Sequence, residues 1–175
     1  MREKWTDRTF RFDLPVGRMP FLLERLRGVA ARLEEKVRGV SSEDLRRRVG
    51  EGWSAQENIG HLSDLEHVHL ARLDELAAAS PPETLMAADI KNRKTWEADH
   101  NARPIDEVLE EFRVGRATLV ERFEKWDPAR LEVRAIHPRL RVPMRVIDVA
   151  YFTAEHDDYH LARVHELLAS FRTGG

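Results

Sequence analysis

The sequence predicts an all-α fold: a four-helix bundle with long crossover connections, formed by a single domain that spans residues 1–175. Two observations predict the bundle. Apolar residues recur at the helical spacing i, i+3, i+4, i+7 in four separate stretches, and two of the connections between these stretches are long. The length of 175 residues fits one ordinary domain with its own core. Bundles of this kind commonly build metal sites from side chains on facing helices.

Start and stop signals bound the four predicted helices, which run approximately over residues 15–39, 54–80, 104–127 and 143–174. In the second helix, Ser54 and Glu57 have the spacing of a capping box. In the third, acidic residues after Pro104 suit the positive end of a helix dipole. The fourth carries an apolar stripe that includes two histidines, and it is therefore the most informative segment.

Three connections complete the predicted architecture. Residues 42–49 form a short helical turn, and residues 131–142 have room for a short hairpin. The polar connection from Pro82 to Arg103 is longer than an inert loop usually needs. We therefore expect it to cover one end of the bundle.

Composition narrows the class of function. Lys and Arg number 29 and Asp and Glu number 31, so the chain has no basic footprint for nucleic acid and no polybasic patch for a membrane. With no cysteine, imidazole and carboxylate are the metal ligands available. No apolar stretch approaches the ~20 residues of a membrane span. We expect a soluble, cytoplasmic protein without nucleic-acid or membrane partners.

Three histidines form the candidate functional site. His156 and His160 are four residues apart, which places both imidazoles on one face of a helix within reach of one ion. His61 lies one turn into the second helix, beside its buried stripe. Three histidines with an open position for water are the pattern of a catalytic zinc site, and imidazole also suits nickel, copper and iron. The sequence thus predicts a divalent transition-metal site at His61, His156 and His160.

These residues resemble a known family. The run from Trp53 to Asp64, with Ser54 and His61, followed by the H-x-x-x-H of His156 and His160, is similar to the DinB-like superfamily of bacterial bundle proteins. The resemblance implies an up-down-down-up four-helix bundle and frequent homodimers. It also implies a three-histidine site for zinc, nickel or a similar ion. Some members use a low-molecular-weight thiol as co-substrate, and others are assigned as metal-dependent hydrolases.

Several neighbouring residues have two interpretations each. Glu57 could be a general base toward a metal-bound water, although the capping box already occupies its carboxylate. Arg163 could hold an anionic substrate group or make a surface ion pair. Asp64 could reach the site or solvent. The other histidines are interpreted as structural; they are His67, His69, His100, His137 and His165.

The resulting hypothesis is a metal-dependent enzyme that activates water or a thiol and acts on a small molecule, as a hydrolase or a thiol S-transferase. Metal identity stays open, with zinc or nickel favoured. The alternative hypothesis is a non-catalytic metal-binding bundle with a structural, sensory or dimeric role. Loss of the fold on metal removal favours that alternative, and an intact metal-free fold favours catalysis.

Overall fold

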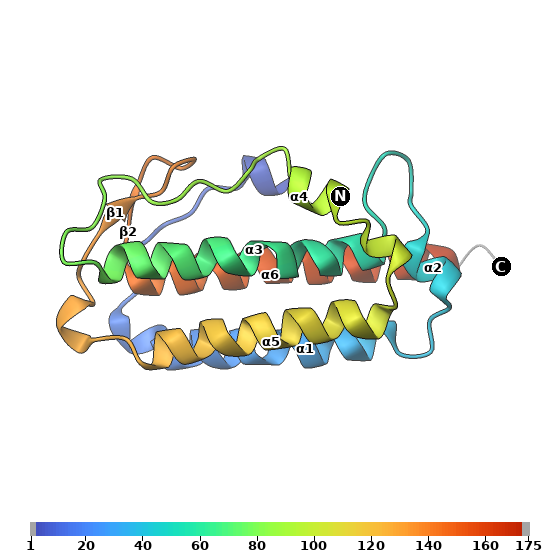
Figure 1. The fold of residues 1–175 in the computed structure, drawn as a ribbon, viewed down its shortest axis with the longest axis horizontal. Helices are drawn as coiled ribbons and strands as arrows, with labels where there is room; N and C mark the ends of the chain where they lie inside the picture. The colour runs from blue at the N-terminus through green and yellow to red at the C-terminus, as the bar shows by residue number, and fades with distance from the viewer. Residues whose placement is uncertain (1–2, 173–175) are drawn as a thin grey trace.

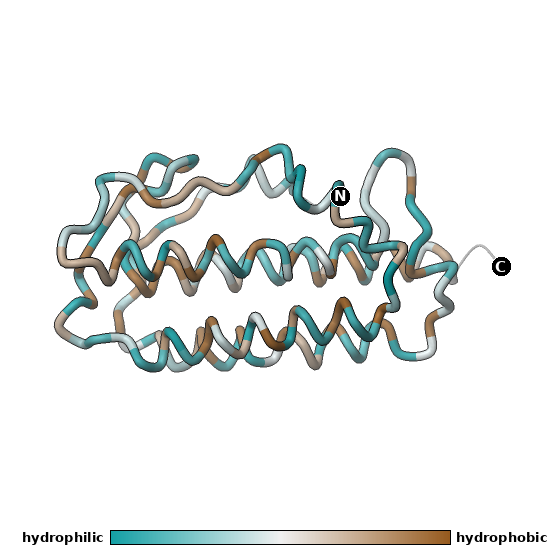
Figure 2. The backbone as a smooth tube through the Cα atoms, in the orientation of Figure 1, coloured by the Kyte–Doolittle hydropathy of each residue, from teal (hydrophilic) through white to brown (hydrophobic). Residues whose placement is uncertain are grey.

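The computed structural model describes residues 3–172, and helices dominate it (Figure 1). The four long helices of the prediction are all present, which confirms the fold class. They are α1 (Met19–Val37), α3 (Ala55–Ala77), α5 (Ile105–Glu124) and α6 (Val146–Arg172). Along each of them apolar and polar residues alternate, as expected of helices that bury one face (Figure 2). The predicted end of the fourth helix at Gly174 lies outside the described residues.

Short elements connect the long helices. Two short helices, α2 (Ser42–Arg46) and α4 (Arg93–Glu97), lie in the first and second connections. A short hairpin forms from β1 (Ala135–Ile136), inside the expected stretch, and β2 (Pro143–Met144), which lies just beyond it where the fourth helix was expected to begin; the two strands pair antiparallel. Single 3-10 turns are η1 (Trp5–Asp7), η2 (Val16–Arg18), η3 (His100–Ala102) and η4 (Pro128–Arg130).

The order of the helices confirms the up-down-down-up topology. Both α1 and α3 pack against α5 and α6. In Figure 1, α1 and α6 run in one direction, and α3 and α5 run in the other. Because α3 and α5 are parallel neighbours, residues 78–104 must return along the whole bundle before α5 begins.

The path of this returning segment differs from the one expected from the sequence. The connection from Pro82 to Arg103 does not cover an end of the bundle; it runs lengthwise along the side of α3 (Figure 1). Backbone hydrogen bonds of 2.9 Å from Leu85 to Ile136 and of 2.8 Å from Ile136 to Glu83 attach its beginning to β1. The parallel arrangement of α3 and α5 explains the difference, since a connection between such helices has to span their length.

The apolar core is divided into two clusters by a polar layer in the middle of the bundle. One cluster includes Leu26, Leu73 and Leu119, and the other includes Leu33 and Phe112. The four helices contribute to both clusters. Buried polar side chains lie at the level between them; they are His61, Glu66, His69, Arg116, His156, Asp157 and His160.

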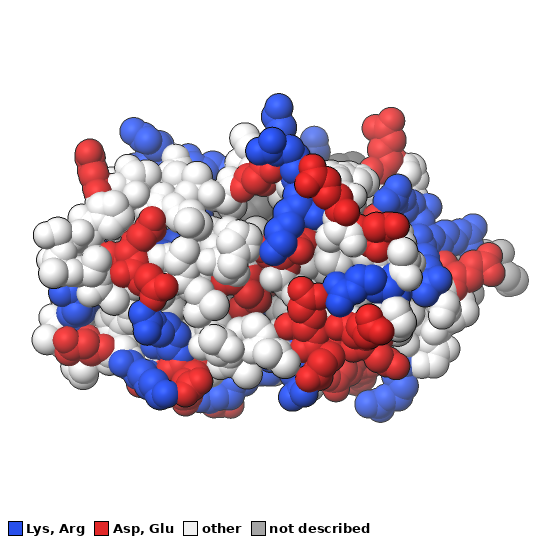
Figure 3. All heavy atoms as spheres, in the orientation of Figure 1, with Lys and Arg blue, Asp and Glu red and all other residues white. Residues whose placement is uncertain are grey.

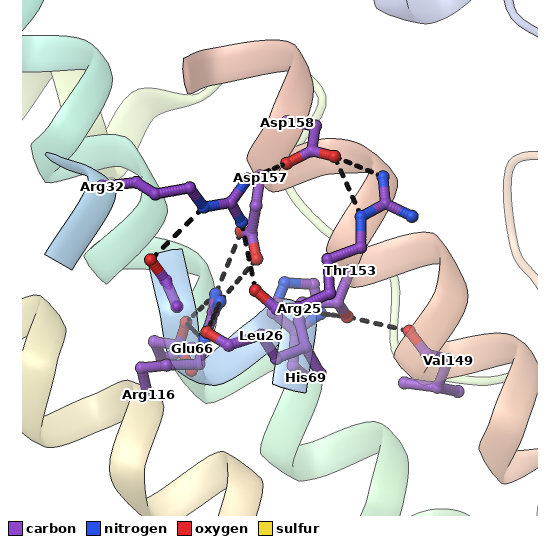
Figure 4. A network of polar contacts seen from close by, with 11 residues as sticks. Arg25, Leu26, Arg32, Glu66, His69, Arg116, Val149, Thr153, Asp157 and Asp158 are labelled. Atoms are coloured by element: carbon purple, nitrogen blue, oxygen red, sulfur yellow. Dashed lines mark hydrogen bonds and ion pairs between the residues drawn. The ribbon is translucent and has the colours of Figure 1, made fainter. Parts of the chain in front are cut away.

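Arg116 is the centre of this layer (Figure 4). Its guanidinium donates to Glu66 of α3 at 2.7 Å, to Asp157 of α6 at 3.0 Å and to the Leu26 carbonyl of α1 at 3.5 Å. All three charged residues are at most 4% exposed. Gly115 permits the close approach of α5, because a Cβ there would lie 3.1 Å from Cγ of Glu66. One side chain therefore fixes the positions of all four helices.

Charge on the surface is mixed. Figure 3 shows basic and acidic side chains interspersed over the face it presents. Many of them pair, as Arg113 does with Glu110 on α5. Within the described residues, no helix is both long and apolar enough to cross a membrane.

We predict that Arg116→Met lowers the free energy of unfolding by about 3–5 kcal/mol, because Glu66 and Asp157 would stay buried without their partner. Urea denaturation followed by circular dichroism measures the loss. The matched control is Arg113→Met on the same helix, whose exposed ion pair contributes less than about 1 kcal/mol. Equal stability of the two variants would contradict the central role of Arg116.

Candidate metal centre

His61, His156 and His160 lie together in the polar layer. One ring nitrogen of each lies within 4.8 Å of those of the other two. His61 comes from α3, while the other two occupy successive turns of α6. The three residues are only 4–5% exposed. The structure thus assembles the cluster that the sequence predicted, because α3 and α6 are packing neighbours.

Asn58 orients the ring of His160. The distance from His160 Nδ1 to Asn58 Oδ1 is 2.9 Å. The amide nitrogen of Asn58 donates to the carbonyls of Ser54, at 2.7 Å, and Trp53, at 3.3 Å, which fixes the direction of its oxygen. Because that oxygen accepts, Nδ1 of His160 carries a proton, and in a neutral ring Nε2 is then the nitrogen that holds the lone pair.

A longer relay orients His61. Its Nδ1 lies 3.0 Å from Oγ1 of Thr95 on α4. The carboxylate of Asp64 accepts from Nε2 of His100 at 2.9 Å, and the nearby hydroxyl of Thr95 also lowers its pKa. With its hydroxyl hydrogen directed toward this carboxylate, Thr95 can accept from Nδ1 of His61, which leaves the lone pair of the neutral ring on Nε2.

Burial keeps His61 and His156 neutral, while hydrogen bonds keep the nearby carboxylate of Asp64 charged. Burial lowers the pKa of His61 to about 4 and that of His156 well below its ordinary value. For Asp64, burial acts to raise the pKa, but hydrogen bonds from His100 and Thr95 outweigh it and the pKa is lowered. Neutral imidazoles are the form that binds metal, so the protonation state suits a ligand set.

The surroundings of His156 indicate whether the residues present suit a metal ion. Among the described residues its Nδ1 is buried and has no hydrogen-bond partner. The ring packs edge-on against Trp5, with centroids 4.9 Å apart. A buried polar nitrogen without a partner is costly. The three imidazoles each offer one ring nitrogen within 4.8 Å of the other two, and they make a donor set suited to zinc, nickel or a similar ion.

The three histidines open into a cavity of about 680 Å³ between α3, α6 and the connection 78–104. Trp5 and Trp53 both line it beside the histidines. Asn92, from the connection, also lines it. The volume is of the size that holds a small molecule.

Of the two residues predicted to take part in catalysis, Arg163 lines the cavity and Glu57 does not. Arg163 lines the cavity one turn beyond His160, and its Nη1 lies 3.6 Å from Glu166. Glu57 is not among the lining residues. Its carboxylate accepts from the backbone N–H of Ser54 at 2.9 Å and pairs with Arg48, so the capping box is confirmed.

Most of the residues that orient the histidines were not predicted from the sequence. Thr95 and His100 come from the connection, where no periodicity marked them. Asp64, whose direction was open, faces His100 and Thr95. One local signal existed: Gly60 precedes His61, and a Cβ at Gly60 would lie 2.3 Å from the ring of His100.

The fold and this cluster define a class: four-helix bundles with a buried three-histidine site. The sequence profile of the DinB superfamily matches residues 18–164, and the chain belongs to that superfamily. No curated protein matches the chain significantly.

Two solved structures resemble this one. YfiT from Bacillus subtilis, described as a probable metal-dependent hydrolase with an unusual four-helix bundle topology, aligns with a TM-score of 0.77 and 17% identity over 95% of this chain and 94% of its own. A mycothiol-dependent maleylpyruvate isomerase aligns with a TM-score of 0.66 and 12% identity over 89% of this chain and 63% of its own. At these identities the likeness establishes the fold.

A buried histidine of the cavity wall gives a pH prediction. Burial holds the pKa of His69 well below its ordinary value. Below pH 6.5 the unfolded chain therefore takes up a proton that folded His69 does not, and acidification favours unfolding. At pH 5, His69 accounts for about 2 kcal/mol of lost stability.

Urea denaturation of chelator-treated protein at pH 7.5 and 5.0 measures this loss, which we expect to be smaller by that amount in His69→Gln. The control is His67→Gln, which changes an exposed histidine of the same helix and should keep the wild-type loss. An unchanged acid sensitivity of His69→Gln would show that His69 is protonated in the folded protein.

Proposed function

We propose that this protein is a metal-dependent enzyme that holds a divalent ion, zinc or nickel, through His61, His156 and His160 and acts on a small molecule. The observation that carries the proposal is the convergence of three buried imidazoles on one point at a cavity. When bound, such an ion lowers the pKa of a coordinated water or thiol and so supplies a nucleophile at neutral pH. The reaction class is hydrolysis or thiol S-transfer.

The chain's own residues position the site. Asn58 and Thr95 hold two of the rings in the tautomer that presents Nε2. Trp5 and Trp53 cover the histidines from the cavity side, with ring centroids 4.9 Å from His156 and 4.6 Å from His61. Aromatic walls exclude water and lower the local dielectric, which strengthens the electrostatic interactions at the site.

We propose that Arg163 binds an anionic group of the substrate near the histidines. It lines the cavity next to the cluster, and its Nη1 lies at the long distance of 3.6 Å from the carboxylate of Glu166. Glu57 is not used as the base, because its carboxylate is held by Arg48 and by the backbone of Ser54. The relatives support both reaction classes, since one is described as a probable hydrolase and the other as mycothiol-dependent.

Elemental analysis tests the metal site. Protein purified without an affinity metal column should contain about one equivalent of zinc, nickel or a similar ion, and the His156→Ala, His160→Ala double variant should contain none. The matched control is His165→Ala on the same helix, which lies outside the cluster. Absence of metal in the wild type after reconstitution would withdraw the enzymatic proposal.

Metal removal separates catalysis from a structural role. The two buried apolar clusters and the Arg116 ion pairs do not depend on the ion. We therefore expect chelated protein to keep its helicity and to lose turnover of hydrolysis or thiol-transfer substrates. Unfolding on chelation would favour the non-catalytic alternative. The homodimer implied by the family resemblance stays a prediction, checked by light scattering.

The relay behind His61 gives a second prediction for the metal. Thr95→Val removes the acceptor of His61 Nδ1 at nearly constant volume, and partners of this kind contribute about 10–100-fold to metal affinity. Competition with a chromophoric chelator measures the loss. Thr118→Val, on the exposed side of α5, is the control. Wild-type affinity in Thr95→Val would contradict the role of the relay.

A further inference from the structure

A second group of polar side chains lines the same cavity away from the histidines. Arg72 lies on α3, and His137 and Arg139 lie in the loop of the β1–β2 hairpin. We call these three residues the basic subsite. Arg72 is eleven residues beyond His61, which corresponds to about 16 Å along the helix axis. The cavity is therefore elongated, with the three histidines and the basic subsite at separate places along α3.

The two guanidiniums of the basic subsite lack acidic partners. Nε of Arg72 donates to the Met86 carbonyl at 3.0 Å, and Nη1 of Arg139 donates to the Thr6 carbonyl at 3.3 Å. Within residues 3–172 neither makes an ion pair. Nη2 of Arg139 is buried and has no acceptor there. Arg72 is 3% exposed, and buried arginines are almost always paired.

His137 contributes another donor without an acceptor. Its Nδ1 accepts from the backbone N–H groups of Arg139, at 3.2 Å, and of Leu140, at 3.1 Å. Because Nδ1 accepts, the proton of the neutral ring must be on Nε2. That Nε2 is buried and, among the described residues, has no hydrogen-bond partner. The ring is fixed by its backbone contacts and by Phe152, whose centroid is 4.9 Å away.

The electrostatics of the basic subsite indicate an uncompensated positive charge. Burial lowers the pKa of Arg72 to about 10, with Glu75 opposing and Arg139 adding to the effect. Burial likewise lowers the pKa of Arg139. One carboxylate, Asp89, occurs among the described lining residues, and it is bonded to Arg93. A bound anion would supply what these groups lack.

We propose that Arg72, His137 and Arg139 bind the carboxylate of an organic acid whose apolar body extends along the cavity toward the three histidines. A carboxylate matches the fork of a guanidinium, and its single charge costs less to desolvate than the two of a phosphate. The α3 wall between the two places presents the apolar side chains of Leu65 and Val68, with His69 as its polar member. A reaction at the far end of the acid, beside the histidines, rests on the proposed function, whereas binding of the carboxylate does not.

Ligand binding to chelator-treated protein tests the subsite independently of the metal. Trp5 and Trp53 line the cavity, so quenching of tryptophan fluorescence reports occupancy. The probes are decanoate, its uncharged counterpart decanol, and decyl phosphate. We expect saturable binding of decanoate that is at least about tenfold tighter than that of decanol, because decanol offers no charge to the guanidiniums.

Variants locate the carboxylate. Arg72→Met and Arg139→Met should each weaken decanoate binding at least about tenfold and leave decanol binding unchanged. The control is Arg134→Met, an exposed arginine paired with Glu132 near the same hairpin, which should bind decanoate like the wild type. Circular dichroism establishes that each variant is folded. A His61→Ala variant should keep decanoate binding in the absence of metal.

Three results would overturn the proposal. One is equal affinity for decanoate and decanol, or no saturable decanoate binding. Another is loss of decanoate binding in His61→Ala with retention in Arg72→Met, which would place the carboxylate at the histidines. The third is tighter binding of decyl phosphate than of decanoate, which would assign the subsite to a phosphate ester. Because no metal is present, none of these results depends on the fate of the proposed enzymatic activity.

Discussion

The ion pairs of Arg116 with Glu66 and Asp157 are the constraint on which the site depends. Burial raises the pKa of Glu66 to about 7 and also raises that of Asp157, so these carboxylates tolerate the interior only beside the guanidinium. Asp157 immediately follows His156 on α6, and Glu66 is on the same helix as His61. When Arg116 holds these two acids, it also fixes the register of α6 against α3. The histidines meet because that register is fixed.

The bundle topology has a second consequence for the site. Parallel α3 and α5 need a connection that travels the length of the bundle, and this connection becomes a wall of the cavity. It brings Thr95 behind His61 and the Met86 carbonyl to Arg72. A bundle with short hairpin connections would leave this side of α3 to solvent. The crossover thus supplies both the orientation of a candidate ligand and the enclosure that a reaction site needs.

The cavity joins two kinds of chemistry at separate places. Three imidazoles gather at one, where burial lowers the pKa of His61 and of His156 and so favours their neutral, metal-binding form. Hydrogen-bond donors without acceptors gather at the other, around Arg72. Burying unpaired imidazole nitrogens or unpaired donors costs free energy. A bound cation would pair with the imidazoles, and a bound anion would pair with the donors. An elongated acid that satisfies the donors would present its far end to the nucleophile.

The sequence by itself determined the local features of this protein. Helical periodicity located all four long helices, the i, i+4 spacing put His156 and His160 on one face, and Ser54 with Glu57 marked the start of α3. Only the tertiary structure decided the surroundings of the cluster. Thr95 reaches His61 across 34 residues, and Asn58 reaches His160 across 102. Periodicity describes one helix at a time, whereas contacts across such separations depend on how helices and the crossover pack against each other.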